Sequence, residues 1–141
     1  MTVMSANITG RILYPGSAEG PILKLAAPLS FWGGVNPQTG EIILGSHPQR
    51  GLNVRDTVLV LTDPIGSSSS SYVFLELIHN KVAPAALLMG EADAILIVGC
   101  LVAKELGYKA PPVLHVERSL LAGLPETGRI SVADGDFRMI P

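Results

Sequence analysis

The chain reads Thr57-Val58-Leu59-Val60-Leu61 and, after two further residues, Pro64-Ile65-Gly66-Ser67-Ser68-Ser69-Ser70-Ser71-Tyr72-Val73-Phe74. The first stretch is short, apolar and rich in β-branched residues, which predicts a buried strand. Beyond the serines, Val73 pairs with Leu77 and Phe74 with Ile78 at helical spacing. The sequence therefore predicts a strand, a Gly-Ser turn and a helix in direct succession, and we expect a functional site at the turn.

The serine run Ser67–Ser71 is open to two interpretations. A turn that begins a helix presents unpaired backbone N–H groups and hydroxyls at the positive end of the helix dipole, where a carboxylate, a phosphate or a serine base is favoured. Alternatively, five serines form a solvated linker. Apolar segments enclose the run on both sides and no Gly/Pro-rich extension follows it, so we favour a site.

The composition describes a chain with few charges. Of its 141 residues, 48% are hydrophobic and only 16% are charged, and the net charge is −2. Such a chain is expected to expose apolar surface that an obligate partner covers; a large glycine-rich β core is the alternative. No cluster of Lys and Arg is present, so nucleic-acid binding is not expected. The length suits a single domain spanning residues 1–141.

The sequence also bears on the compartment. The first residues lack a basic segment followed by an apolar one, so we expect no secretory signal. The longest apolar stretch, Ala94–Ala103, is about ten residues and too short to span a bilayer, so no membrane association is expected. A single cysteine, Cys100, excludes a disulfide within the chain and fits a reducing, cytoplasmic location.

No metal site is predicted in this chain. Cys100 lies in an apolar stretch, where a buried small hydrophobe is expected, and one thiol cannot hold a structural zinc or an iron–sulfur cluster. The three histidines, His47, His79 and His115, stand far apart in the sequence, and we interpret them as structural or surface residues. His79 ends the predicted helix, where an imidazole complements the dipole.

The remaining elements suggest an α+β fold. Further strands are expected at Ile8–Tyr14, Pro21–Ala26, Glu41–Leu44, Ala85–Met89, Pro112–Val116, Arg129–Ala133 and Phe137–Ile140, the last two forming a hairpin. Helices are expected at Val98–Leu106 and, as a short turn, at Glu117–Leu124. Because strands dominate the first half and mix with short helices in the second, a barrel-like mixed sheet with flanking helices is expected.

A long loop, Pro28–Gly40, contains the only tryptophan and several glycines. Dense glycines allow positive φ and a close approach of the backbone to a ligand or another chain. Loops of this length in a compact domain are usually functional or disordered, and Phe31 and Trp32 argue for an ordered loop. These two aromatics either plug the end of the barrel or form the rim of an active site.

Four blocks of sequence together resemble a known family. They are Gly16-Ser17-Ala18-Glu19-Gly20, the loop 28–40, the Gly66-Ser67 turn and Ala83-Pro84-Ala85-Ala86. In this order and spacing they resemble the small swivelling domain of the aconitase X family, from about Ile8 to Asp134. The resemblance implies a swivelling β/β/α domain and a role as the small subunit of a two-chain dehydratase. It further implies that a large catalytic subunit carries the iron–sulfur cluster on its own cysteines.

The resemblance also assigns roles to residues. The first serine after the glycine is the family's proposed catalytic base, and it corresponds to Ser67. A base is needed because dehydration of a small hydroxy acid removes a carbon-bound proton. The resemblance places the substrate against both the turn and the loop, which implies that the binding residues are Gly66, Ser68, Ser69, Ser30, Phe31, Trp32, Gly33 and Gly34.

The resemblance leaves the substrate open. Members resemble either cis-3-hydroxy-L-proline dehydratases or phosphomevalonate dehydratases. Members commonly have a basic residue immediately before the glycine of the turn, whereas this chain has Ile65. Since a phosphorylated substrate would lose a cation there, we favour hydroxyproline. Two non-catalytic alternatives are a regulatory subunit whose turn binds an anion, and an isolated carboxylate-binding module.

Overall fold

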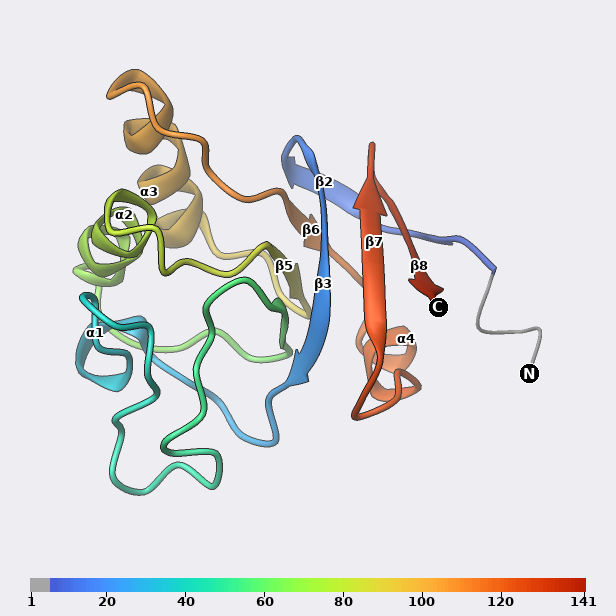
Figure 1. The fold of residues 1–141 in the computed structure, drawn as a ribbon, viewed down its shortest axis with the longest axis horizontal. Coiled ribbons are helices and arrows are strands. Elements are labelled where there is room, and N and C mark those ends of the chain that lie inside the picture. Colours follow the sequence, from blue (N-terminus) through green and yellow to red (C-terminus); the bar gives the residue numbers. More distant parts are fainter. Residues whose placement is uncertain (1–5) are drawn as a thin grey trace.

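A computed structural model describes residues 6–141 of the chain. Figure 1 shows three helices, α1, α2 and α3, gathered on one side of the molecule, with strands β7 and β8 and helix α4 on the other. The elements are β1 Ile8–Thr9, β2 Arg11–Tyr14, β3 Ser17–Lys24, α1 Phe31–Gly34, β4 Val58–Leu61, α2 Ser70–His79, β5 Ala86–Met89, α3 Ala94–Glu105, β6 Val113–His115, α4 Arg118–Ala122, β7 Arg129–Ala133 and β8 Asp136–Ile140.

The strands form one mixed sheet that curls on itself. Its order is β1-β8-β7-β3-β4-β5-β6-β2, with β3 to β6 parallel and the remaining pairs antiparallel. The two edge strands, β1 and β2, are separated in sequence only by Gly10, so one stretch of chain pairs at both ends of the sheet. This arrangement confirms the expected α+β fold with a barrel-like mixed sheet.

Gly10 allows this closure because the chain passes close to another strand there. A Cβ at Gly10 would lie 3.0 Å from the His115 carbonyl oxygen and 3.1 Å from Val116 Cγ2. The Gly10 N–H donates to the Gly135 carbonyl oxygen at 2.8 Å, which holds the strand to the β7–β8 turn. A larger residue would force the two edges of the sheet apart.

The central parallel strands are buried on both faces and separate two hydrophobic cores. In β4, Leu59 and Leu61 face the core beneath α1, α2 and α3, whereas Val58 and Val60 face the core shared with β7, β8 and α4. Strand β5 alternates in the same way. The continuous apolar runs in the sequence therefore reflect strands that are covered on both sides, and the result is the β/β/α layering that was expected.

Several predicted boundaries differ from the structure. Strand β3 begins at Ser17 instead of Pro21, because its first half pairs with β7 and only its second half with β4. The predicted strand at Glu41–Leu44 is wrong: this segment makes only two isolated bridges, Glu41 with Asn53 and Ile42 with Val35. Helix α3 begins at Ala94, four residues before the prediction, because the Asp93 carboxylate caps it by accepting from the Ile95 N–H at 2.9 Å.

Two predictions about single residues are confirmed. Cys100 is fully buried in the helix-side core, where burial raises the pKa of its thiol to about 12. His79 is the last residue of α2, and its Nδ1 lies 2.7 Å from the Tyr108 hydroxyl. Among the helices of residues 6–141, none is long and apolar enough to cross a membrane.

Candidate active site

The predicted site lies at the carboxyl ends of the parallel strands. The serine turn follows β4, and α2 begins at Ser70, so the last two serines belong to the helix. Gly66, Ser67 and Ser68 are exposed, Ser69 is partly buried, and Ser70 is only 3% exposed. Ligands commonly bind at the carboxyl ends of parallel strands in both open and closed sheets, so the sheet itself places the turn where a site is expected.

The turn is held by hydrogen bonds among its own serines. The Ser69 N–H donates to Ser67 Oγ at 3.0 Å, and the Ser70 N–H donates to the Ser67 carbonyl oxygen at 2.9 Å. Within residues 6–141 no acceptor pairs with the N–H groups of Ser67 and Ser68. The turn therefore presents free amide donors beside the hydroxyl of Ser67, at the positive end of α2.

The structure brings the loop 28–40 against the serine turn. Gly66 has a φ of +110°, and a Cβ there would lie 2.0 Å from Ser30 Oγ and 2.5 Å from Ser30 Cβ. The Trp32 N–H donates to Ser70 Oγ at 3.2 Å, and the Ser30 hydroxyl donates to the Trp32 carbonyl oxygen at 2.9 Å. Two segments that are about forty residues apart thus form one surface, as the predicted site requires.

The loop residues divide into an anchor and an exposed rim. The Phe31 side chain is 1% exposed and packs edge-on against Phe74, with ring centroids 5.3 Å apart. Gly34 is also buried, and it packs so closely on Leu29 that a Cβ would lie 2.9 Å from Leu29 Cδ1. Trp32 is 56% exposed, and Gly33 is exposed with a φ of +77°. Phe31 is therefore part of the helix-side core, and Trp32 and Gly33 lie on the open face beside the turn. A position for Trp32 on the rim of an active site stays a prediction.

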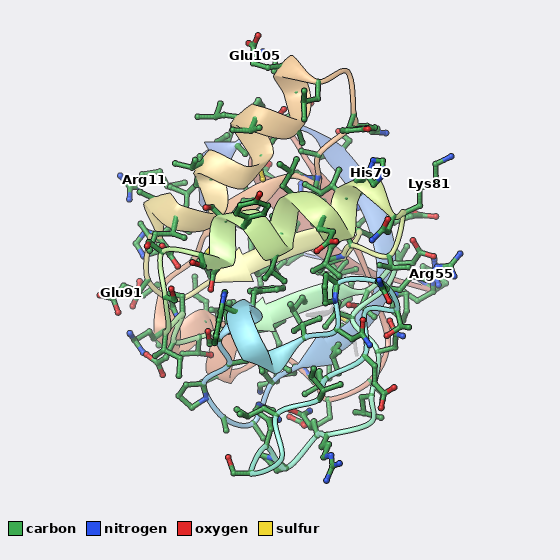
Figure 2. The ribbon with its side chains drawn as sticks, turned by 90° about the vertical axis from the view of Figure 1, so that its left-hand side faces the viewer. Arg11, Arg55, His79, Lys81, Glu91 and Glu105 are labelled. Carbon is green, nitrogen blue, oxygen red and sulfur yellow. The ribbon has the colours of Figure 1, made fainter. Side chains whose placement is uncertain are left out.

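An ion-pair cluster lies beside the turn and was not predicted from the sequence. Arg118, at the start of α4, donates to Asp63, which lies between β4 and the serine turn, and to Glu91 Oε2 at 3.1 Å. The hydrogen bond to Asp63 raises the pKa of the Arg118 guanidinium, and the charges of both carboxylates add to this effect. Figure 2 shows Glu91 toward the end of α2 opposite His79, which is the end where the serine turn lies.

This cluster joins the ends of three neighbouring parallel strands. Asp63 follows β4, Glu91 follows β5 and Arg118 follows β6. Because two carboxylates face one guanidinium, the net charge of these three side chains is negative. The parallel order of the strands places these three side chains together, whereas the sequence shows only that each follows a predicted strand.

The described residues do not suit an iron–sulfur cluster. Within residues 6–141, no group of three or more His, Cys, Asp or Glu side chains is arranged to hold a metal ion. Cluster ligation requires thiolates, and the buried Cys100, with its pKa near 12, stays protonated. His47 is also occupied structurally, because its Nδ1 accepts from the Gln49 N–H at 3.0 Å and its Nε2 lies 3.2 Å from the Ala27 carbonyl oxygen.

Comparison with known proteins finds similar chains among named dehydratases. The chain is 42% identical to a cis-3-hydroxy-L-proline dehydratase of Pseudomonas aeruginosa over 75% of its own length but only 18% of that protein's. It is 39% identical to the phosphomevalonate dehydratase small subunit of Methanothermobacter thermautotrophicus, over 66% of this chain and 71% of that one. The crystal structure of Thermococcus kodakaraensis aconitase X in its holo-form superposes with a TM-score of 0.85 at 28% identity, covering 96% of this chain and 99% of that chain.

The chain thus spans less than a fifth of the hydroxyproline dehydratase that it matches and most of the phosphomevalonate small subunit. Residues 7–139 match the family described as the aconitase X swivel domain. The sequence blocks, the sheet that closes at Gly10 and the structural superposition agree, and the chain belongs to the aconitase X swivel domain family.

Proposed function

We propose that this chain, as one swivel domain, is the small subunit of a two-chain dehydratase in which Ser67 is the catalytic base. The observation that carries this proposal is the exposed Ser67 hydroxyl, held at the start of α2 beside free amide donors. Relatives that are named small subunits support a large partner. We assign the iron–sulfur cluster of the enzyme to that partner, and a cytoplasmic location to the complex.

The chemistry assigned to this chain is a proton transfer. In dehydration a C–H bond breaks and its electron pair forms the new double bond as the hydroxyl leaves the neighbouring carbon. Ser67 must first be ionised, and its alkoxide then takes up this proton. Release of that proton together with the departing hydroxide accounts for the water that is lost. The Ser69 N–H at 3.0 Å and the helix dipole both stabilise negative charge on that oxygen. Closure by the large subunit strengthens both effects, because it removes competing water.

The remaining predicted residues take binding roles. The free N–H groups of Ser67 and Ser68 are suited to a substrate carboxylate. Gly66 supports them indirectly, because its missing side chain lets the turn pack against Ser30. Trp32 and Gly33 form the open rim, and Ser69 and Ser30 hold the turn and the loop in place through their hydrogen bonds. Phe31 and Gly34 contribute through the loop conformation, since both are buried.

We propose cis-3-hydroxy-L-proline as the substrate. Ile65 supplies no cation before the turn, and Arg118 is already bonded to Asp63 and Glu91. A phosphate group would therefore meet a negative balance of charge on this side of the site, whereas a zwitterionic amino acid would not. Phosphomevalonate is the second candidate, because relatives of similar length to this chain are named phosphomevalonate dehydratase small subunits.

Co-expression with the large aconitase X subunit of the same organism tests this proposal. The purified complex is assayed anaerobically with each substrate, and each chain alone serves as a control. Turnover of cis-3-hydroxy-L-proline that requires both chains supports the assignment. Turnover of phosphomevalonate alone overturns the choice of substrate, and an intact, cluster-loaded complex that dehydrates neither compound favours a regulatory, anion-binding subunit.

A further inference from the structure

Helix α3 is apolar on every side over its first ten residues. Its inner face, formed by Leu96, Gly99, Cys100 and Ala103, is buried in the core. Its outer face is apolar too, since Val98 is 47%, Leu101 51% and Val102 39% exposed. The first charged residue of the helix is Lys104. A helix that is hydrophobic all round is normally buried on all sides, so the outer face of α3 lacks a cover in the isolated chain.

The uncovered surface continues from α3 onto α2. A hollow of about 180 Å³ between the two helices is lined by residues of both, among them Tyr72, Leu75, Val98 and Val102. Tyr72 is 76% exposed, the most exposed large apolar side chain among those that the structure describes. Figure 2 shows α2 and α3 side by side on the face toward the viewer, where this surface lies. We name the surface formed by Tyr72, Val98, Leu101, Val102 and Leu106 the helix face.

The helix face reaches the rim of the candidate active site. Tyr72 lies two residues after Ser70, whose hydroxyl accepts from the Trp32 N–H. Ile65 and Trp32, which are 51% and 56% exposed, add large apolar side chains on and beside the serine turn. A partner that covers Ser67 and excludes water from it therefore meets apolar surface at the edge of the turn. This surface continues over Tyr72 and Val98, with the carboxylates of Glu76 and Asp93 at its margin.

We propose that the helix face is the docking surface for the large aconitase X subunit, an inference that rests on the proposed function. Large apolar side chains that are about half exposed supply a substantial part of the roughly 800 Å² that each partner contributes to a stable interface, and monomers rarely expose such a patch. The hydroxyproline dehydratase relatives carry the matched region within a chain more than five times as long, so the domain has further protein beside it there. Tyr72 and Leu101 are the expected anchors.

The test compares two leucine substitutions on opposite sides of the molecule. Leu101→Asp changes the helix face. Leu120→Asp changes a leucine that is 41% exposed on α4, and Figure 1 shows α4 on the opposite side of the molecule from α2 and α3. Affinity for the purified large subunit is measured by isothermal titration calorimetry, and circular dichroism verifies that each variant is folded. We expect Leu101→Asp, and separately Tyr72→Asp, to weaken association at least tenfold, while Leu120→Asp stays within twofold of the unmodified chain.

The outcomes separate this inference from the proposed function. One outcome is a complex that forms and turns over substrate while Leu101→Asp and Leu120→Asp weaken its affinity equally, or not at all. That result overturns the docking surface and leaves the proposed function standing. Sedimentation of the isolated chain as a dimer that Leu101→Asp dissociates would show that a second copy covers the face, which also overturns it. Failure of the unmodified chains to associate or to dehydrate either substrate removes the proposed function itself.

Discussion

The contact between Gly66 and Ser30 makes the junction of turn and loop sensitive to one methyl group. In Gly66→Ala, the new Cβ would lie 2.0 Å from Ser30 Oγ and 2.5 Å from Ser30 Cβ, so rotating the Ser30 hydroxyl cannot relieve the overlap. The φ of +110° is also unfavourable for alanine. Backbone strain costs about 1–3 kcal/mol and overpacking a similar amount. We therefore expect a loss of about 2–4 kcal/mol in the free energy of unfolding, together with loss of activity in the complex.

The free energy of unfolding is measured by urea denaturation. The transition is followed by circular dichroism and by the fluorescence of Trp32, the only tryptophan, which lies at the junction. Gly33→Ala is the matched control, because its φ of +77° imposes strain but nothing lies within 4 Å of its Cβ. We expect that control to cost only about 1 kcal/mol.

A second substitution isolates the steric part of the cost. Ser30→Gly removes the two atoms nearest the new methyl group and leaves Ser30 Cα, at 3.3 Å. The double variant Gly66→Ala with Ser30→Gly should therefore be at least about 1 kcal/mol more stable than the sum of the single changes predicts. Strictly additive effects, or a Gly66→Ala variant no less stable than Gly33→Ala, would refute the reasoning.

Three further predictions follow from single contacts. Ser70→Ala removes the 3.2 Å bond to the Trp32 N–H and should destabilise the chain by about 1 kcal/mol, with a change in Trp32 fluorescence that Ser71→Ala does not produce. Phe31→Ala should cost about 3–5 kcal/mol in a denaturation titration, because it empties a buried site against Phe74; a loss below 1 kcal/mol would show that Phe31 does not anchor the loop. Cys100 has a folded-state pKa raised by burial from 9.0 to about 12, so its contribution to stability is complete below pH 9 and is lost as the pH rises toward 12. Cys100→Ala should reduce the fall in stability over that range, and native Cys100 should resist iodoacetamide at pH 8; rapid alkylation of the folded chain would contradict its burial.

Much of the fold could be predicted because the buried parallel strands carry continuous apolar runs. Strands β4 and β5 were placed to within one residue, and Arg129–Ala133 matches β7. The errors arise where pairing between strands that are distant in the sequence sets the bounds of a strand. Gly20 and Pro21 hide the continuity of β3, yet a side chain at Gly20 would strike the Asp56 carbonyl oxygen at 2.4 Å, which explains the glycine.

The site was predicted in part for the same reason. The serine turn can be recognised from the local sequence, because a glycine and several serines lie between a predicted strand and a predicted helix. Its contact with Ser30 and Trp32 was expected only from the family resemblance, and the buried position of Phe31 could not be read from its neighbours. The cluster of Arg118 with Asp63 and Glu91 depends on the order of strands in the sheet, although acidic residues that follow successive predicted strands were a usable signal.

The central claim is that Ser67 is the base, and Ser67→Ala in the assembled complex tests it most directly. Ser68→Ala is the matched control, because it keeps the backbone N–H while removing a neighbouring exposed hydroxyl. With both complexes intact by size-exclusion chromatography, we expect kcat to fall at least about 100-fold for Ser67→Ala and less than tenfold for Ser68→Ala, since general-base catalysis contributes about 10²–10⁴. A Ser67→Ala complex that retains more than a tenth of the activity would contradict the account.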